Sequence, residues 1–215
     1  VLSGVAGSGK SSLLAAFTAQ YPRAIVIDQR PIGTSTRSTP ATYTGVMDEI
    51  RKVFAKASGV TPQWFSFNSK GACPVCKGKG EIIPEVAFAD PVAILCEECG
   101  GRRYNSKALS YTYQGKNIEE VLQLTVEEAS TFFAQKKISH PLQMLAEVGL
   151  GYMSLGQSTA SMSGGEIQRL KLAGELQKTG SIYVLDEPAA GLHTQDVVKL
   201  MDLLQTLIEQ GNTVL

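Results

Sequence analysis

The sequence has no long apolar run and no excess of either charge. None of its segments approaches the roughly 18 to 20 consecutive apolar residues that a membrane-spanning helix needs. Its 20 basic and 20 acidic side chains cancel, so the overall charge gives no argument for a nucleic-acid partner, and any contact with DNA must come from a local patch. These absences argue against a membrane protein and leave a globular chain.

The sequence also lacks a secretory leader and an initiating methionine. No charged and apolar leader opens the chain, so we expect a cytoplasmic protein. The chain starts at Val1, and it stops at Leu215 where a new apolar strand begins, which indicates a fragment of a longer protein. With 215 residues and 43% apolar content, it is long enough to bury a core, as one large domain or two small ones.

Strand and helix patterns alternate at both ends of the chain. The opening stretch "VLSGVAGSGKSSLLAAF" predicts an apolar strand, a glycine-rich loop and a helix that turns Leu13, Leu14 and Phe17 inward. A buried strand follows over 24–28. Near the other end, an apolar strand ends in two acids, and a helix follows over about 194–209. This alternation predicts a doubly wound α/β core.

The middle of the chain has a different pattern. A helix is predicted near 46–57, and short alternating stretches broken by glycines predict a small β-rich insert over about 62–114. Thr125 and Glu128 form a capping box, and a helix is predicted from Pro141 to Val148, which places His140 near a helix start. The core is therefore expected to be split by an insert.

A phosphate-binding loop stands near the start. Gly4, four residues, then Gly9, Lys10 and Ser11 match G-x-x-x-x-G-K-[ST] between a strand and a helix. Its backbone amides can wrap phosphates, Lys10 can reach the β and γ oxygens of ATP, and Ser11 can offer its hydroxyl to Mg²⁺. A glycine-rich turn with an unremarkable lysine is the weaker alternative. The predicted nucleotide-binding residues are Gly4, Gly7, Gly9, Lys10, Ser11, Ser12 and Asp186.

Two acids end the strand "IYVL". Asp186 is placed to hold Mg²⁺, and Glu187 beside it is placed to orient and polarise an attacking water. An apolar run ending in acids is common, so this pattern gains weight only because a phosphate loop precedes it in the same chain.

The stretch "SMSGGEIQRLKLAGEL" predicts a helix with a bare start. Ser163 and Glu166 form a capping box, while Ile167, Leu170, Ala173 and Leu176 share one apolar face. The amides of Gly164 and Gly165 are not covered by side chains, and the positive end of the helix dipole favours an anion there. A plain capped surface helix is the alternative.

Four cysteines form a C-x2-C-x19-C-x2-C pattern, the spacing of a four-thiolate zinc site. The predicted ligands are Cys73, Cys76, Cys96 and Cys99, and four thiolates leave no open position, so the metal is expected to be structural. Glycines after each pair suit turns in which amides approach the sulfurs. A redox dithiol or disulfides are the alternatives.

Basic residues gather around the cysteines. A DNA-contacting patch is one interpretation, and a solvated surface of mixed charge is equally favoured, because five acidic residues share the segment. The candidate DNA contacts are Lys77, Lys79, Arg102, Arg103 and Lys107.

The order of these motifs resembles the ATP-binding cassette (ABC) family, in which an S-G-G signature helix follows the phosphate loop and a glutamine loop. A cysteine module between glutamine and signature resembles more narrowly the UvrA class of bacterial nucleotide excision repair, and specifically its C-terminal half. Long stretches carry this resemblance, among them "IDQRPIGTSTRSTPATYTGV", "MSGGEIQRLKLAGEL" and "LDEPAAGLH".

The resemblance implies a P-loop ABC-type core over 1–40 and 176–215, and a signature domain over 41–175 that carries the zinc-binding insert. It implies that Gln29 senses Mg²⁺ and nucleotide. It also implies that Ser163, Gly164, Gly165 and Gln168 act in trans on ATP held by a second nucleotide-binding domain. The implied partners are that second domain, duplex DNA and, through parts outside this sequence, a UvrB-like protein; the implied cofactors are ATP, Mg²⁺ and structural Zn²⁺.

Three features depart from the family pattern. The stretch between Lys10 and Gln29 is shorter than expected, "AAGLH" stands where T-T-G-L-H is usual, and the chain stops before the switch histidine, a role that His193 does not fill. The first two departures favour a UvrA-like paralogue for resistance to DNA-binding antibiotics as the first alternative. A transporter motor and a purely structural zinc module are the others, and weak or absent ATPase activity is expected of the isolated chain.

Overall fold

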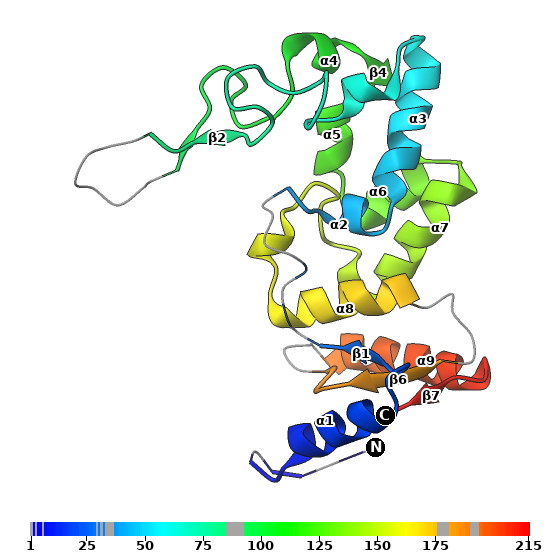
Figure 1. Ribbon diagram of the computed structural model, residues 1–215. Coiled ribbons are helices and arrows are strands. Elements are labelled where there is room, and N and C mark those ends of the chain that lie inside the picture. The colour runs from blue at the N-terminus through cyan, green and yellow to red at the C-terminus, as the bar shows by residue number, and fades with distance from the viewer. Residues whose placement is uncertain are drawn as a thin grey trace.

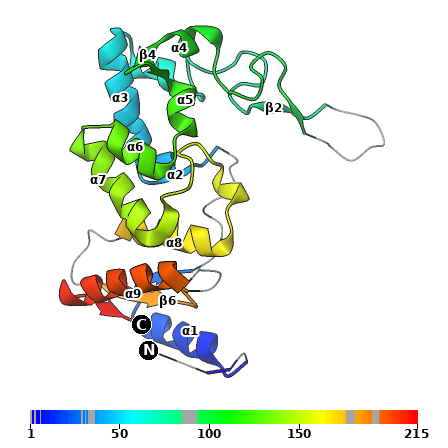
Figure 2. The same cartoon turned by 180° about the vertical axis from the view of Figure 1, so that it is seen from behind.

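The computed structural model describes residues 2, 4–5, 7–28, 30, 32, 37–84, 93–175, 181–189 and 194–215. The two ends of the chain form a layer with a small sheet, and the middle forms a helical lobe above it (Figure 1). An arm of largely irregular structure extends from the lobe to one side. The view from behind shows the same three parts (Figure 2).

Three parallel strands lie at the centre of the lower layer: β1 (Ile25–Ile27), β6 (Ile182–Leu185) and β7 (Thr213–Val214), in the order β1-β6-β7. In both views helices α1 (Lys10–Gln20) and α9 (Thr194–Glu209) lie on opposite sides of the sheet. The α/β prediction for the two ends is therefore confirmed, as are the strand over 24–28 and the helix over 194–209.

The prediction that α1 turns Leu13, Leu14 and Phe17 inward is wrong for Leu13 and holds in part for the other two. The Leu13 side chain is 54% exposed, Leu14 and Phe17 are half-buried, and no residue of α1 is fully buried. Among the described residues the sheet has three short strands, which offer α1 little surface. Phe17 instead stacks on Tyr21 with ring centroids 4.6 Å apart.

Five helices build the lobe: α2 (Pro40–Tyr43), α3 (Val46–Ser58), α5 (Ile118–Gln123), α6 (Val126–Phe132) and α7 (Lys136–Leu145). As predicted, α3 is a helix, and the capping boxes that begin α5 and α6 explain why both start where they do.

The core of the lobe is apolar and aromatic. Phe54 of α3 and Leu142 of α7 are fully buried, and Phe54 lies 5.1 Å from the Phe65 ring and 5.8 Å from the Tyr113 ring, centroid to centroid. This core continues without a break from Ile27 of the sheet through the lobe. The lobe and the sheet therefore share one hydrophobic core.

Helix α7 begins earlier than predicted, at Lys136. Pro141 lies inside it, and the chain continues through a wider turn, η2 (Ala146–Leu150), in which Gly149 has φ 78°. The regular helix thus ends at Leu145, before the predicted end at Val148, and Gly149 breaks the helical conformation within η2, because a left-handed conformation suits glycine. His140 is an exposed residue in the middle of α7 and not near its start.

The described residues of the insert are less rich in β-structure than predicted. "WFSF" begins in a 3-10 turn, "LSYTY" begins in a helix, and "EVAF" lies outside the described residues. Glycine turns around the cysteines replace most of the expected strands. The elements are η1 (Pro62–Phe65), β2 (Glu81–Ile82), β3 (Ile94–Leu95), α4 (Ser106–Ser110), β4 (Thr112–Tyr113) and β5 (Lys116–Asn117).

Helix α8 (Gly164–Glu175) follows the short turn η3 (Thr159–Ser161) and lies between the lobe and the sheet in both views (Figures 1 and 2). Ile167, Leu170 and Ala173 are buried as predicted, and Leu176 lies outside the described residues. Within the described part of the chain, no helix has the length and apolarity that a bilayer crossing requires.

We predict that Leu142→Ala lowers the free energy of unfolding by about 2–5 kcal/mol, because it leaves a cavity in the shared core. The matched variant Leu13→Ala, at a 54% exposed position, should change that free energy by less than about 0.5 kcal/mol. Urea unfolding followed by circular dichroism measures both. Equal losses would contradict the exposed placement of α1.

Candidate functional site

The phosphate loop curls around its own lysine. Gly7 and Gly9 have φ 79° and 86°, a left-handed conformation that explains the need for glycine. Lys10 Nζ donates to the carbonyl oxygens of Gly4 at 2.6 Å and Val5 at 3.0 Å. The ammonium group therefore stands inside the loop, where phosphate oxygens can replace the carbonyls.

The predicted acids lie beside this loop. Ser11 Oγ donates to Asp186 Oδ2 at 3.5 Å, although the two residues stand near opposite ends of the sequence. A cavity of about 230 Å³ is lined by Lys10, Asp186 and Glu187, together with apolar residues of α1, α9 and the chain end. A hydroxyl and a carboxylate are oxygen ligands of the kind Mg²⁺ takes, so the pair fits a magnesium ion.

Glu187 has an unusual backbone. Its φ is 47°, a left-handed conformation that is uncommon for a residue other than glycine, asparagine or aspartate. Such conformations persist where the surroundings impose them, and they gather at active sites. Ser12 is exposed in the first turn of α1, and Gln29 and His193 lie outside the described residues.

Helix α8 starts with the predicted capping box. Ser163 N donates to Glu166 Oε2 at 2.7 Å, and Glu166 N donates to Ser163 Oγ at 3.3 Å. Burial acts to raise the pKa of Glu166, but hydrogen bonds from Tyr152 and Ser163 outweigh it and lower the pKa below its usual range. Ser163 is exposed and Gly164 and Gly165 are partly exposed, so this helix start can meet an anion from outside.

Gln168, in contrast to Ser163, Gly164 and Gly165, does not face outward. The residue is 2% exposed, and its amide Nε2 donates to the carbonyl oxygens of Ile27 at 3.1 Å and Asp186 at 2.9 Å. In this structure the side chain is bound within its own chain, so a contact in trans would require it to leave both carbonyls.

Lys171, which the sequence analysis missed, anchors the same face of α8. Its Nζ donates to Asp28 Oδ1 at 2.6 Å and to the carbonyl of Arg30 at 2.9 Å. Burial acts to raise the pKa of Asp28, but hydrogen bonds from Lys171 and Arg30 lower it below its usual range. Lys171 could have been found from its i, i+3 spacing to Gln168, because this spacing places both residues on one helix face.

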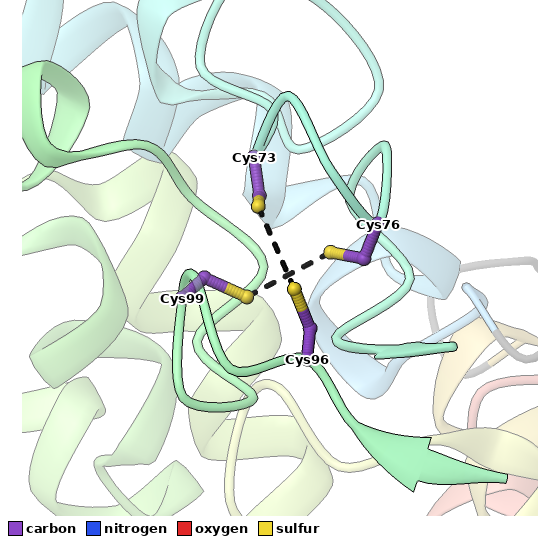
Figure 3. A group of neighbouring side chains, drawn as sticks. All are labelled: Cys73, Cys76, Cys96 and Cys99. Atoms are coloured by element: carbon purple, nitrogen blue, oxygen red, sulfur yellow. Dashed lines mark hydrogen bonds between the residues drawn. The ribbon is translucent and has the colours of Figure 1, made fainter.

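The four cysteines converge in the arm (Figure 3). All are buried, and their sulfur atoms lie within 4.8 Å of one another. Cys73 Sγ is 3.9 Å from Cys96 Sγ, and Cys76 Sγ is 3.7 Å from Cys99 Sγ. An ion held tetrahedrally by four thiolates at about 2.3 Å places the sulfurs about 3.8 Å apart. The cluster can therefore hold a metal ion.

Glycine turns shape the cluster. Gly80 N donates to Cys76 Sγ at 3.2 Å. Gly78 has φ 79°, and a Cβ at that position would stand 1.7 Å from the Phe67 carbonyl oxygen. Burial raises the pKa of Cys99 to about 12. It acts in the same direction on Cys76, but hydrogen bonds from Gly80 and from neighbouring thiols lower that pKa to about 7.

The candidate DNA contacts divide into two groups. Lys77 and Lys79 are exposed in the first cysteine turn. The other three support the arm: Arg103 Nε donates to the Gly78 carbonyl at 3.2 Å, Arg102 Nε donates to the Cys99 carbonyl at 3.0 Å, and Lys107 Nζ lies 4.7 Å from the Trp64 ring centroid. Arg103 also lies over the Phe67 ring at 4.4 Å.

Comparison with known proteins places this geometry in a family. Residues 1–190 match the family model described as ABC transporter. UvrABC system protein A from Aquifex aeolicus is 47% identical over 247 aligned positions, which cover 99% of this chain. The chain belongs to the UvrA class of ABC ATPases. The corresponding protein from Staphylococcus aureus is also 47% identical, over 100% of the chain.

A solved structure agrees with this assignment. UvrA2 from Deinococcus radiodurans superposes with a TM-score of 0.87 at 44% identity, over 99% of this chain and 30% of that one. The chain spans about a quarter of the length of the UvrA proteins that it matches. Their alignments are longer than its 215 residues, so the UvrA proteins carry residues that this chain lacks.

We predict that Asp28→Asn lowers the free energy of unfolding by about 1–2 kcal/mol at pH 7, because Lys171 loses a charged partner. The folded-state pKa of Asp28 is lowered, so its contribution is present above the unfolded pKa of about 4 and is lost as pH falls through the folded-state pKa. Urea unfolding at pH 7 and pH 3 should show the difference shrink. An undiminished difference at pH 3 would contradict the ion pair. The control variant is Asp48→Asn, which alters a carboxylate whose side chain is 72% exposed.

We also predict that the purified protein carries about one transition-metal ion per chain and that Cys96→Ser largely removes it, because three thiolates bind such an ion more weakly than four. Elemental analysis measures the metal content. The control Val75→Ser alters a 53% exposed residue between the first two cysteines and should leave the ion in place. A metal-free wild-type protein would refute the site.

Proposed function

We propose that this chain is the nucleotide-binding part of a UvrA-type ATPase that binds ATP with Mg²⁺ and couples hydrolysis to the recognition of damaged duplex DNA. One observation supports this proposal above the others. The loop lysine and Ser11 lie against Asp186 and Glu187 at one end of the sheet, in a chain whose relatives at 47% identity carry the UvrA name.

Each residue of that site has a proposed role. Lys10 and the loop amides bind the β and γ phosphates, and Ser11 and Asp186 hold Mg²⁺, which neutralises developing charge on the phosphate oxygens when it is bound. Glu187 orients the attacking water, and Gln29 senses the occupied site. The nucleotide core comprises 1–40 and 176–215, and the signature domain comprises 41–175.

Hydrolysis needs a second nucleotide-binding domain. The exposed start of α8 offers the amides of Gly164 and Gly165 and the hydroxyl of Ser163 to the γ-phosphate of an ATP held by that domain. ATP binding then favours closure of the pair, because the closed state gains contacts that the open state lacks. An isolated chain should therefore turn over weakly.

The cysteine cluster is proposed to hold structural Zn²⁺. Sulfur distances of 3.7 and 3.9 Å suit tetrahedral thiolate coordination, and the four buried ligands leave no open position for catalysis. Exposed Lys77 and Lys79 on the same arm are the proposed contacts to DNA phosphates. A cytoplasmic repair complex that includes a UvrB-like protein follows from the same proposal.

We predict that Lys10→Ala reduces ATP affinity at least tenfold, because the loop loses the ammonium group that faces the phosphates. Isothermal titration calorimetry with a non-hydrolysable ATP analogue and Mg²⁺ measures the affinity. The control Lys56→Ala alters an exposed lysine of α3 and should bind like the wild type. Unchanged affinity in Lys10→Ala would argue for a purely structural module.

We further predict that the full-length protein binds a duplex with a bulky lesion more tightly than an intact duplex, and more so with ATP. Fluorescence anisotropy at one fixed salt concentration measures the affinities, since salt alone shifts them strongly. The double variant Lys77→Ala, Lys79→Ala should weaken binding to both duplexes. Equal affinity for damaged and intact DNA would overturn the repair assignment and favour the drug-resistance paralogue.

A further inference from the structure

Gln168 joins the helix that carries the S-G-G motif to the ends of two strands. Ile27 is the last residue of β1, and Asp186 directly follows β6, which pairs with β1 in parallel. The Gln168 amide nitrogen lies 3.1 Å from the first carbonyl oxygen and 2.9 Å from the second. One side chain thus serves two backbone acceptors at the point where both strands end.

The orientation of this amide is fixed by chemistry. Carbonyl oxygens accept hydrogen bonds and do not donate them, so only the NH₂ group of Gln168 can face both. Its Oε1 atom is buried and has no partner among the described residues. Turning the amide over would place this oxygen against two carbonyls, so the observed orientation is the favourable one.

The Asp186 carbonyl has a particular position. It belongs to the peptide plane that joins Asp186 to Glu187, and the rotation of that plane sets the φ of Glu187, which is 47°. A hydrogen bond that holds this carbonyl therefore also holds Glu187 in its left-handed conformation. The carboxylate of Asp186 itself accepts a hydrogen bond from Ser11 Oγ at 3.5 Å.

We infer that Gln168 is a positioning residue for ATP hydrolysis: by holding the Asp186–Glu187 peptide plane, it aims the Glu187 carboxylate at the position of the attacking water. This inference rests on the proposed ATPase function and assigns Gln168 a role within its own chain rather than in trans. It also makes the start of α8 and the acid pair parts of one unit.

A purely structural role is the competing explanation, since Gln168 also attaches α8 to the sheet. Lys171 supplies three further bonds to the chain after β1, to Asp28 and to the Arg30 carbonyl. The attachment of α8 therefore does not depend on Gln168 alone. The Asp186 carbonyl, in contrast, receives its side-chain hydrogen bond from Gln168.

The test uses the full-length protein. Gln168→Met keeps the length and burial of the side chain and removes its donors. We expect kcat to fall at least tenfold, which corresponds to about 1.4 kcal/mol of transition-state stabilisation, while the Kd for ATP with Mg²⁺ changes less than twofold. Gln168→Glu also removes these donors but adds a negative charge, and its kcat should be similar to that of Gln168→Met. The control Gln143→Glu alters an exposed glutamine of α7 and should leave kcat unchanged.

A double-mutant cycle separates positioning from structure. If Gln168 acts through Glu187, then Gln168→Met in a Glu187→Gln background should lower the residual rate less than twofold. The same tenfold loss in both backgrounds, or a wild-type kcat in Gln168→Met, would overturn the inference. Absence of ATP hydrolysis by the full-length wild type would instead refute the proposed function, so the two failures are distinguishable.

Discussion

The nucleotide site depends on the parallel pairing of β1 with β6. Val26 pairs with Val184, although the two strands come from opposite ends of the sequence. Parallel strands end at the same edge of a sheet, so this pairing brings the chain after β1 and the acids after β6 to one place. The S-G-G helix, the acids and the exit from β1 meet there because the intervening lobe returns the chain to that edge.

The arm is held together by a different principle. The sheet and the lobe share one apolar core, whereas the four cysteines form a separate small cluster with Ile82 beside them. The very short strands of the arm contribute little to its stability, and a bound metal can supply what a small core cannot. Gly78, pressed against the Phe67 carbonyl, fits only without a side chain, which ties the cluster closely to the lobe.

Much of the site could be predicted from the sequence, because its chemistry depends on fixed local spacing. The phosphate loop, the acids after a buried strand and the paired cysteines are each defined by a short local pattern. The structure places Ser11 beside Asp186 and the four cysteine sulfurs within 4.8 Å of one another, while the roles of these residues stay predictions. The exposure of Leu13 could not be predicted, because it depends on how much sheet α1 meets. The shortage of strands in the insert likewise follows from cysteine turns, each of which finds its partners in the other cysteine pair. The inward position of Gln168 could not be predicted, because it depends on where the fold places Ile27 and Asp186.

One hydrogen bond outside the nucleotide site joins the stretch before α2 to the arm. Arg37 Nη2 donates to the carbonyl of Lys77 at 3.0 Å, and Arg37 follows closely in sequence after Asp28, which is bound to α8. The first cysteine turn is therefore joined to the stretch before α2 by a hydrogen bond, in addition to its own chain connections. Lys77, a proposed contact to DNA phosphates, therefore has its backbone carbonyl held by a residue from the stretch before α2.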